Sequence, residues 1–270
     1  MVRVEMLAVG RELLIGKTMN SNAFWIGRRL AKMGSMIKEI TTVDDDLDEI
    51  GAALLAITRR TPDFLVVVGG LGPTPDDMTL KGVARALRLR LAPSEEALRL
   101  IRAHYTARGM AEVAMTPPRK KMATLPAGSA PLKNEVGTAP GVRLVAGRTV
   151  IFCLPGVPIE MRWIFRRSVE PEIREKVGVI YRRNVMMRLL GVPESALAPA
   201  LATELKRHPG AYIKSHPRGT AGGVSRILID IVVAGADRGK VDQEEEAIML
   251  ELKAAVAALG GTVGAVESSA

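Results

Sequence analysis

The sequence of 270 residues contains a single cysteine, Cys153, so no disulfide can form within the chain. Since disulfides are typical of oxidising compartments and no Cys-x-x-Cys pair occurs, we expect a cytoplasmic protein. No run of about 18 uncharged apolar residues is present, which predicts that no helix spans a membrane and that no membrane partner is needed.

Aromatic residues are also scarce, at 3% of the chain, although the net charge is +9. A basic protein can bind nucleic acid or small anions, but single-strand readers need aromatic platforms for the bases. The composition therefore disfavours nucleic acid as a partner and suits an anionic small molecule. One glutamine and four asparagines, both thermolabile residue types, favour a heat-adapted source.

The usual nucleophiles and zinc ligands are missing as motifs. His104, His208 and His216 do not have metal-ligand spacing, and Cys153 lies in an apolar strand where a core role is expected. No Gly-x-Ser-x-Gly elbow occurs. Chemistry in this chain would therefore rest on carboxylates, a lysine and a metal ion.

The residues that are present alternate between apolar runs and helical periods, which predicts a doubly wound α/β fold with a mostly parallel sheet. The segment Asp63–Val68 is apolar throughout its last five residues, as in strands buried on both faces. We expect this domain to span residues 1–172, followed by a small α+β domain of βαββα pattern at 173–270. The other strands expected in the first domain are Val4–Val9, Ile37–Val43 and Thr149–Leu154.

Three loops follow such strands and meet at one sheet edge. Residues 69–79 (Gly-Gly-Leu-Gly-Pro-Thr-Pro-Asp-Asp-Met-Thr) combine glycines, which allow close backbone approach, with adjacent carboxylates. Asp44-Asp45-Asp46 and Leu154–Pro158 end two further strands. If the glycine loop binds phosphate, the adjacent carboxylates require a divalent cation or a basic ligand group to neutralise them. The alternative interpretation of residues 69–79 is a structural turn in which Asp76 caps the following helix.

Five segments carry a resemblance to a known family: residues 10–16 (Gly-Arg-Glu-Leu-Leu-Ile-Gly), 69–79, 120–123, 134–141 and 154–161. Their motifs resemble the molybdopterin-binding-type domain of the MoaB and MogA proteins and, more closely, the N-terminal region of the CinA family. Residues 191–195 are similar to the start of that family's small middle domain. No counterpart of the family's C-terminal amidase domain follows, so deamidation of nicotinamide mononucleotide is not expected.

The resemblance implies a pocket for a phosphorylated small molecule, a nucleotide or a pterin, and assembly as a dimer or trimer. It implies a divalent metal ion (cobalt, magnesium or manganese) at Asp45 and Asp77. The catalytic residues implied are Asp45, Asp77 and Lys121, with Lys121 and the glycine amides holding phosphate. The expected substrate-binding residues are Glu12, Asn22, Gly69, Gly70, Gly72, Thr74, Asp76, Thr79, Asn134, Gly137, Thr138, Ala139, Pro155, Gly156, Pro158 and Glu160.

Three functions stay open at this point. The first is a metal-dependent nucleotide pyrophosphatase acting on ADP-ribose-like dinucleotides, and the second is a molybdenum-cofactor protein that binds or adenylylates a pterin phosphate. The third is an RNA-binding module that uses the small domain with its basic, glycine-rich segment 217–223. One departure concerns the first: Arg11 stands where the family has aspartate, removing a possible metal ligand and adding a cation.

Overall fold

The strand order of the larger sheet is that of a doubly wound α/β fold, as the sequence predicted. The order is β2-β1-β3-β8-β7-β6; the first four strands are parallel, and β7 and β6 run antiparallel to their neighbours. The strands are β1 (Arg3–Val9), β2 (Met36–Val43), β3 (Phe64–Val68), β6 (Ala130–Leu132), β7 (Gly141–Ala146) and β8 (Thr149–Leu154).

The computed structural model describes residues 2–110, 113–221 and 223–269 and divides into two compact units, Met1–Val177 and Gly178–Ala270. The boundary expected after residue 172 falls inside helix α8 (Glu170–Val177), which ends the first unit. Gly222, within segment 217–223, lies outside the described residues. Among the described residues, no helix is both long and apolar enough to cross a bilayer.

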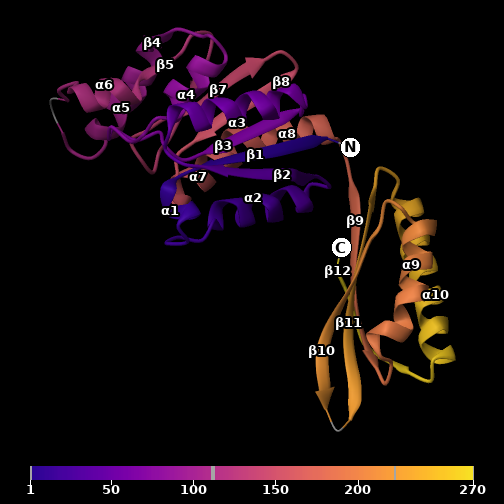
Figure 1. Cartoon of the computed structure of the whole chain (residues 1–270). Helices are drawn as coiled ribbons and strands as arrows, with labels where there is room; N and C mark the ends of the chain where they lie inside the picture. The colour runs from indigo at the N-terminus through magenta and orange to yellow at the C-terminus, as the bar shows by residue number, and fades with distance from the viewer. Residues whose placement is uncertain (1, 111–112, 222, 270) are drawn as a thin grey trace. The chain divides into compact units, whose positions relative to one another are not determined.

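Helices cover both faces of the first sheet because alternate side chains of its central strands point to opposite sides. Leu7, Leu65 and Val67 pack on one side, and Met6 and Val66 on the other. The first side is covered by α3 (Leu47–Arg59), α4 (Thr79–Ala86), α5 (Glu95–Thr106) and α6 (Pro117–Met122). The second is covered by α2 (Ser21–Lys32), α7 (Pro158–Ile164), the π-helix η1 (Phe165–Val169) and α8 (Figure 1). Two small additions are helix α1 (Arg11–Leu14) and the ladder of β4 (Leu91–Pro93) and β5 (Thr124–Pro126).

The second unit is a four-stranded antiparallel sheet of order β10-β11-β9-β12, with both helices on one face (Figure 1). The predicted βαββα pattern is present but is followed by a strand that sequence analysis missed, β12. Residues 260–264 include three glycines and that strand is largely exposed, so its apolar alternation is weak. The elements are β9 (Tyr181–Leu190), α9 (Glu194–Arg207), β10 (Tyr212–Ala221), β11 (Val224–Gly235), α10 (Arg238–Ala258) and β12 (Thr262–Ser269).

The packing of α4 on α3 makes a testable prediction at Gly82. A Cβ at Gly82 would lie 2.5 Å from Cγ2 of the fully buried Ile50, so Gly82→Ala should lower the free energy of unfolding by about 1–3 kcal/mol. At Gly27 of α2 the nearest atom, Ile37 Cδ1, would be 3.7 Å away, so Gly27→Ala should raise stability by up to about 1 kcal/mol. Both tryptophans, Trp25 and Trp163, lie in the first unit, so urea unfolding followed by tryptophan fluorescence measures both variants there. Equal changes in the free energy of unfolding for the two variants would contradict the close packing of α4 on α3 at Gly82.

Candidate functional site

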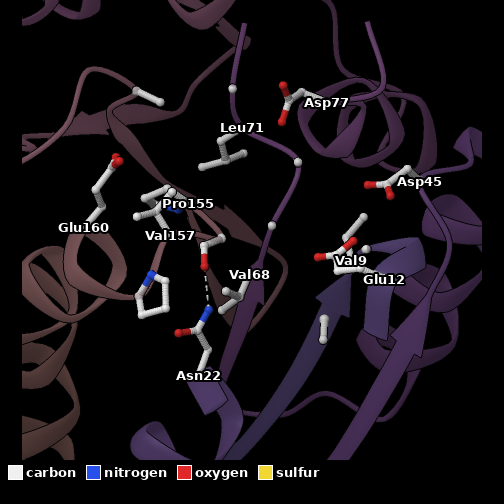
Figure 2. Close-up of a pocket in the computed structure, with 18 of the residues that line it drawn as sticks. Val9, Glu12, Asn22, Asp45, Val68, Leu71, Asp77, Pro155, Val157 and Glu160 are labelled. Atoms are coloured by element: carbon white, nitrogen blue, oxygen red, sulfur yellow. Dashed lines mark hydrogen bonds between the residues drawn. The ribbon is translucent and has the colours of Figure 1, made fainter. Parts of the chain in front are cut away.

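A cavity of about 550 Å³ opens where β1, β2, β3 and β8 end, and residues following each of these strands line it (Figure 2). Connections leave β1 and β3 toward different parts of the sheet, so this is the topological switch point at which open α/β sheets bind ligands. Of the residues expected at the site, the cavity lining brings together Glu12, Asn22, Asp45, Gly69, Gly70, Gly72, Asp76, Asp77, Thr138, Ala139, Pro155, Gly156, Pro158 and Glu160.

The floor of the cavity is the sharp corner at which the chain leaves β3. Gly69 has φ of +112°, and a Cβ there would lie 2.1 Å from the carbonyl oxygen of Val9. The Gly69 amide donates to the carbonyl of Leu154 at 3.0 Å, so this residue contacts the ends of two neighbouring strands. Only glycine combines this backbone conformation with so close an approach.

Thr79 supports the same corner from the first turn of α4. Its hydroxyl donates to the Gly69 carbonyl at 2.7 Å and its amide to the Gly70 carbonyl at 3.2 Å, and its side chain is fully buried. Sequence analysis placed Thr79 against the ligand; in the structure it holds the loop and does not line the cavity.

The loop that follows leaves backbone donors at the cavity. Within the described residues, the amides of Gly70, Leu71 and Gly72 donate to no other group, whereas the Thr74 amide donates to the Asp77 carboxylate. Free amides on a glycine turn at a strand end form a natural binding place for an anion such as phosphate.

Carboxylates dominate the side chains around these amides. Figure 2 shows Glu12, Asp45 and Asp77 on one side of the cavity and Glu160 across from them, and Asp76 also contributes to the lining. No lysine or arginine lines the cavity in the described part of the chain, although the whole protein carries a net charge of +9. The acidic lining is therefore a local feature, opposite in sign to the protein's overall charge.

The Asp45 carboxylate lies among these acidic groups and contacts the start of α1. One carboxylate oxygen accepts from the Arg11 amide at 3.0 Å. Burial raises the pKa of Asp45 above its usual range; the Arg11 amide opposes that rise, and the charges of Glu12, Asp44 and Asp76 add to it.

The side chain of Arg11 turns away from the cavity to Asp44. Its Nε lies 3.0 Å and its terminal nitrogen 2.8 Å from the Asp44 carboxylate, and 70% of the side chain is exposed. This hydrogen-bonded ion pair lowers the pKa of Asp44 below its usual range. The Arg11 guanidinium, which was expected near the pocket, therefore pairs with Asp44. The Asp45 carboxylate stays available to a cation or a ligand.

Asp77 uses part of its carboxylate within its own loop. Oδ2 accepts from the Thr74 amide at 2.9 Å and the Thr74 hydroxyl at 2.5 Å, while Oδ1 accepts no hydrogen bond from the described residues. Thr74, expected to contact ligand, instead orients Asp77 and does not line the cavity. One Asp77 oxygen stays available to a cation or a ligand.

Lys121, expected to hold phosphate, has a different position in the structure. Its Nζ donates to the carbonyls of Gly72, Thr74 and Asp77 at 3.0, 2.5 and 2.8 Å, which uses all three ammonium hydrogens. Burial lowers the pKa of Lys121 below its usual range. It lines a separate small pocket behind the loop, so it supports the 72–77 loop from below and does not reach the main cavity.

Asn134 and Gly137, also expected to contact ligand, form the support beneath Glu160. The buried Asn134 amide donates to the Ala139 carbonyl at 2.9 Å and to Glu160 Oε2 at 2.7 Å, and its oxygen accepts from the amides of Val136 and Gly137. A Cβ at Gly137 would clash with the Glu160 carboxylate. Neither residue lines the cavity; together they orient Glu160, which does.

Asn22 joins the two helices that begin at the cavity. Its side-chain amide donates to the Gly156 carbonyl at 2.8 Å, which ties the first turn of α2 to the turn before α7 (Figure 2). Its oxygen is buried without a hydrogen-bond partner among the described residues.

Four lining residues were not expected from the sequence: Thr18, Met19 and Tyr105 lie outside the motifs, and Met122 lies within segment 120–123 but was not assigned to the site. Of these four residues, Tyr105 is the one that the sequence could have pointed to, because it is a rare aromatic residue in an expected helix. Its ring stacks under Arg119 at 3.8 Å. The other three have no signature, because their position depends on how distant segments pack.

The family model for the probable molybdopterin binding domain matches residues 5–175, which covers the whole site. The chain belongs to this family. The resemblance read from the motifs is thus confirmed at the level of the family.

A solved structure of the protein CinA from Thermoplasma acidophilum is 40% identical, with a TM-score of 0.57 over 63% of this chain and 96% of that chain. A protein from Pyrobaculum arsenaticum is 41% identical over 92% of this chain and 90% of its own length. A protein from Metallosphaera sedula is 38% identical over 98% of both chains. The two relatives match 92% and 98% of this chain and so extend into the second unit, whereas the CinA structure matches 63% of it.

The position of Lys121 makes a testable prediction. Lys121→Met removes three hydrogen bonds to carbonyls of the 72–77 loop, so we expect the free energy of unfolding to fall by about 1–3 kcal/mol. Lys120 is exposed on the same helix, so Lys120→Met should change it by less than about 0.5 kcal/mol. Urea unfolding compares the two variants, and equal stability would show that the ammonium does not hold the loop.

A second prediction concerns Asp45 and pH. The folded protein holds the pKa of Asp45 above its ordinary value near 3.8, so the wild type loses stability relative to Asp45→Asn as pH rises through that pKa. At pH 7 we expect the variant to unfold about 1–2 °C higher, a small effect because the group is partly solvated. The two melting temperatures should converge below the ordinary pKa. A variant less stable than the wild type at neutral pH would contradict the conclusion that burial and neighbouring carboxylates destabilise the charged form of Asp45.

Proposed function

We propose that this protein is a nucleotide pyrophosphohydrolase that acts, with a divalent cation, on ADP-ribose-like dinucleotides in the cytoplasm. One observation carries the proposal: carboxylates and free backbone amides meet in one cavity, and no basic side chain among the described residues lines it. The amides suit the phosphate oxygens of a nucleotide. The carboxylates alone would repel them, so the ligand must bring compensating positive charge.

A divalent cation fits this donor set when it is shared with the ligand. Among the described residues, no group of three or more histidine, cysteine, aspartate or glutamate side chains is arranged to hold a metal ion. Magnesium and similar ions, however, are commonly held by one or two carboxylates together with substrate phosphates. Asp45 and the free oxygen of Asp77 would supply those carboxylates, and a cation would offset both the burial and the neighbouring negative charges that raise the pKa of Asp45.

The residues of the chain would divide the work as follows. Amides of Gly70, Leu71 and Gly72 would bind the phosphate oxygens, and Asp45 and Asp77 would hold the divalent ion. Glu160, across the cavity, would accept hydrogen bonds from ribose hydroxyls or ring N–H groups. A bound divalent ion supplies the remaining chemistry, since it polarises the phosphoryl group and lowers the pKa of an attacking water.

A second candidate function is the binding or adenylylation of a pterin phosphate. The family description favours it, because the matched model is that of a probable molybdopterin binding domain. The same amides and carboxylates suit a pterin phosphate, so the ligand itself must distinguish the two functions.

The experiment is a substrate panel with the purified protein. ADP-ribose, coenzyme A and FAD are incubated with magnesium, manganese or cobalt, and AMP release is measured by chromatography. We expect release from ADP-ribose that depends on the metal ion. No release from any substrate with any metal, together with calorimetric binding of pterin but not of ADP-ribose, would favour the second function.

Asp77 provides the sharpest variant. Asp77→Asn keeps an oxygen that can accept from Thr74 but removes the charge, so we expect turnover to fall by about 100-fold or more with the unfolding temperature nearly unchanged. Asp48→Asn is the matched control, because Asp48 is exposed on α3 and pairs with Arg85 outside the cavity. An unchanged rate in Asp77→Asn would mean that this carboxylate only shapes its loop.

A further inference from the structure

Two helical segments on one face of the first sheet carry arginines and almost no acidic residues. Helix α2 contains Arg28, Arg29 and Lys32 and no carboxylate, and residues 158–169 contain three arginines with Glu160 as their one carboxylate. Glu160 lines the cavity at the start of α7. Apart from Glu160, every charged residue of the two segments is basic.

Aromatic rings lie beneath these arginines. Arg28 is 5.8 Å from the ring centre of Phe24, and Arg162 and Arg166 are 5.8 and 5.4 Å from that of Trp25. Trp25 in turn packs edge-on against Phe165 of η1, with ring centres 5.5 Å apart, so the two segments are in direct contact. We call Phe24, Trp25, Arg28, Arg162 and Arg166 the arginine–aromatic surface.

The charge on this surface is not balanced within the described part of the chain. Buried Glu170 is already used, since it pairs with Arg29 at 2.5 Å and with Arg174 at 2.8 Å. Arg28, Arg162 and Arg166 form no ion pair with any described residue, and Phe24 leaves 69% of its surface exposed. Arg28 and Arg166, which are exposed, therefore offer free cations, and Phe24 offers an exposed ring.

We propose that the arginine–aromatic surface binds single-stranded nucleic acid. Guanidinium groups contact phosphates, and aromatic faces stack on bases without regard to sequence. The low aromatic content of the chain argued against this partner, but composition does not show where the aromatic side chains lie in the fold. Phe24, Trp25 and the neighbouring Trp163, which lies 5.9 Å from Arg167, gather on the two segments that carry the arginines.

Charge complementarity selects this occupant over a second copy of the chain. In a two-fold symmetric contact the same patch meets itself, which would place arginines against arginines with no acidic partner. A polyanion meets the surface without that repulsion. The surface also lies outside the cavity, so the proposal does not depend on the proposed hydrolase activity.

The test is a fluorescence-anisotropy titration of the full chain with a labelled oligothymidylate of about 12 nucleotides. We expect Arg28→Ala/Arg166→Ala to weaken binding by about 10-fold or more, and Phe24→Ala to weaken it as well. Raising salt from about 50 to 200 mM should weaken wild-type binding, with a slope that falls by about 0.7 for each phosphate contact removed. These residues are exposed, so the variants should fold.

The matched control is Arg99→Ala/Arg102→Ala on α5, which removes the same charge from exposed positions outside the surface. The proposal is overturned if wild type does not bind, or if control and test variants lose affinity equally. It is also overturned if Arg28→Ala/Arg166→Ala changes sedimentation but not oligonucleotide affinity, which would make the surface a protein interface. Asp77→Asn should retain oligonucleotide binding whether or not it loses hydrolysis, so the two proposals fail separately.

Discussion

The close approach of Gly69 to the end of β1 is the constraint on which the candidate site depends. A side chain at this position would collide with the Val9 carbonyl, and the Gly69 amide reaches the last residue of β8. Three strand ends are therefore drawn together at one point, with Thr79 holding the corner from α4. The chain beyond that corner can then expose its amides to the cavity while its carbonyls are taken by Lys121. The free amides and the carbonyls bound by Lys121 thus belong to the same short loop, residues 70–77.

The second organising feature is the separation of charge between the cavity and the rest of the protein. Carboxylates from different loops line the cavity, whereas α2 and the α7–η1 segment, which begin beside it, carry arginines. Burial, with a smaller contribution from the neighbouring carboxylates, raises the pKa of Asp45 and costs stability, as is common for groups at functional sites. A cation bound with a phosphorylated ligand would relieve that cost. These arginines lie on the helical segments that begin beside the cavity, but they do not line it.

Much of this arrangement could be predicted from local sequence. The apolar run of β3 and the glycine turn after it indicate a buried parallel strand with a ligand loop, and both are present. Strand β7 was missed although Val142, Leu144 and Val145 are apolar, because Gly141–Ala146 is short and directly follows a loop that contains glycine and proline. The roles of Lys121, Thr79 and Asn134 were also beyond local reasoning. Each binds backbone groups whose positions depend on how separate segments pack, and a motif identifies such residues without showing which way they point.

The most direct measurement for the central claim is calorimetric titration of the protein with ADP-ribose, once in the presence of manganese and once in the presence of a chelator. The account predicts binding that requires the divalent ion, because the carboxylates repel an uncompensated phosphate. Binding should also be lost in Asp45→Asn, because one of the two carboxylates that would hold the ion is removed. Equal affinity with metal and with chelator would contradict it, since the cavity would then hold an anion without any compensating charge.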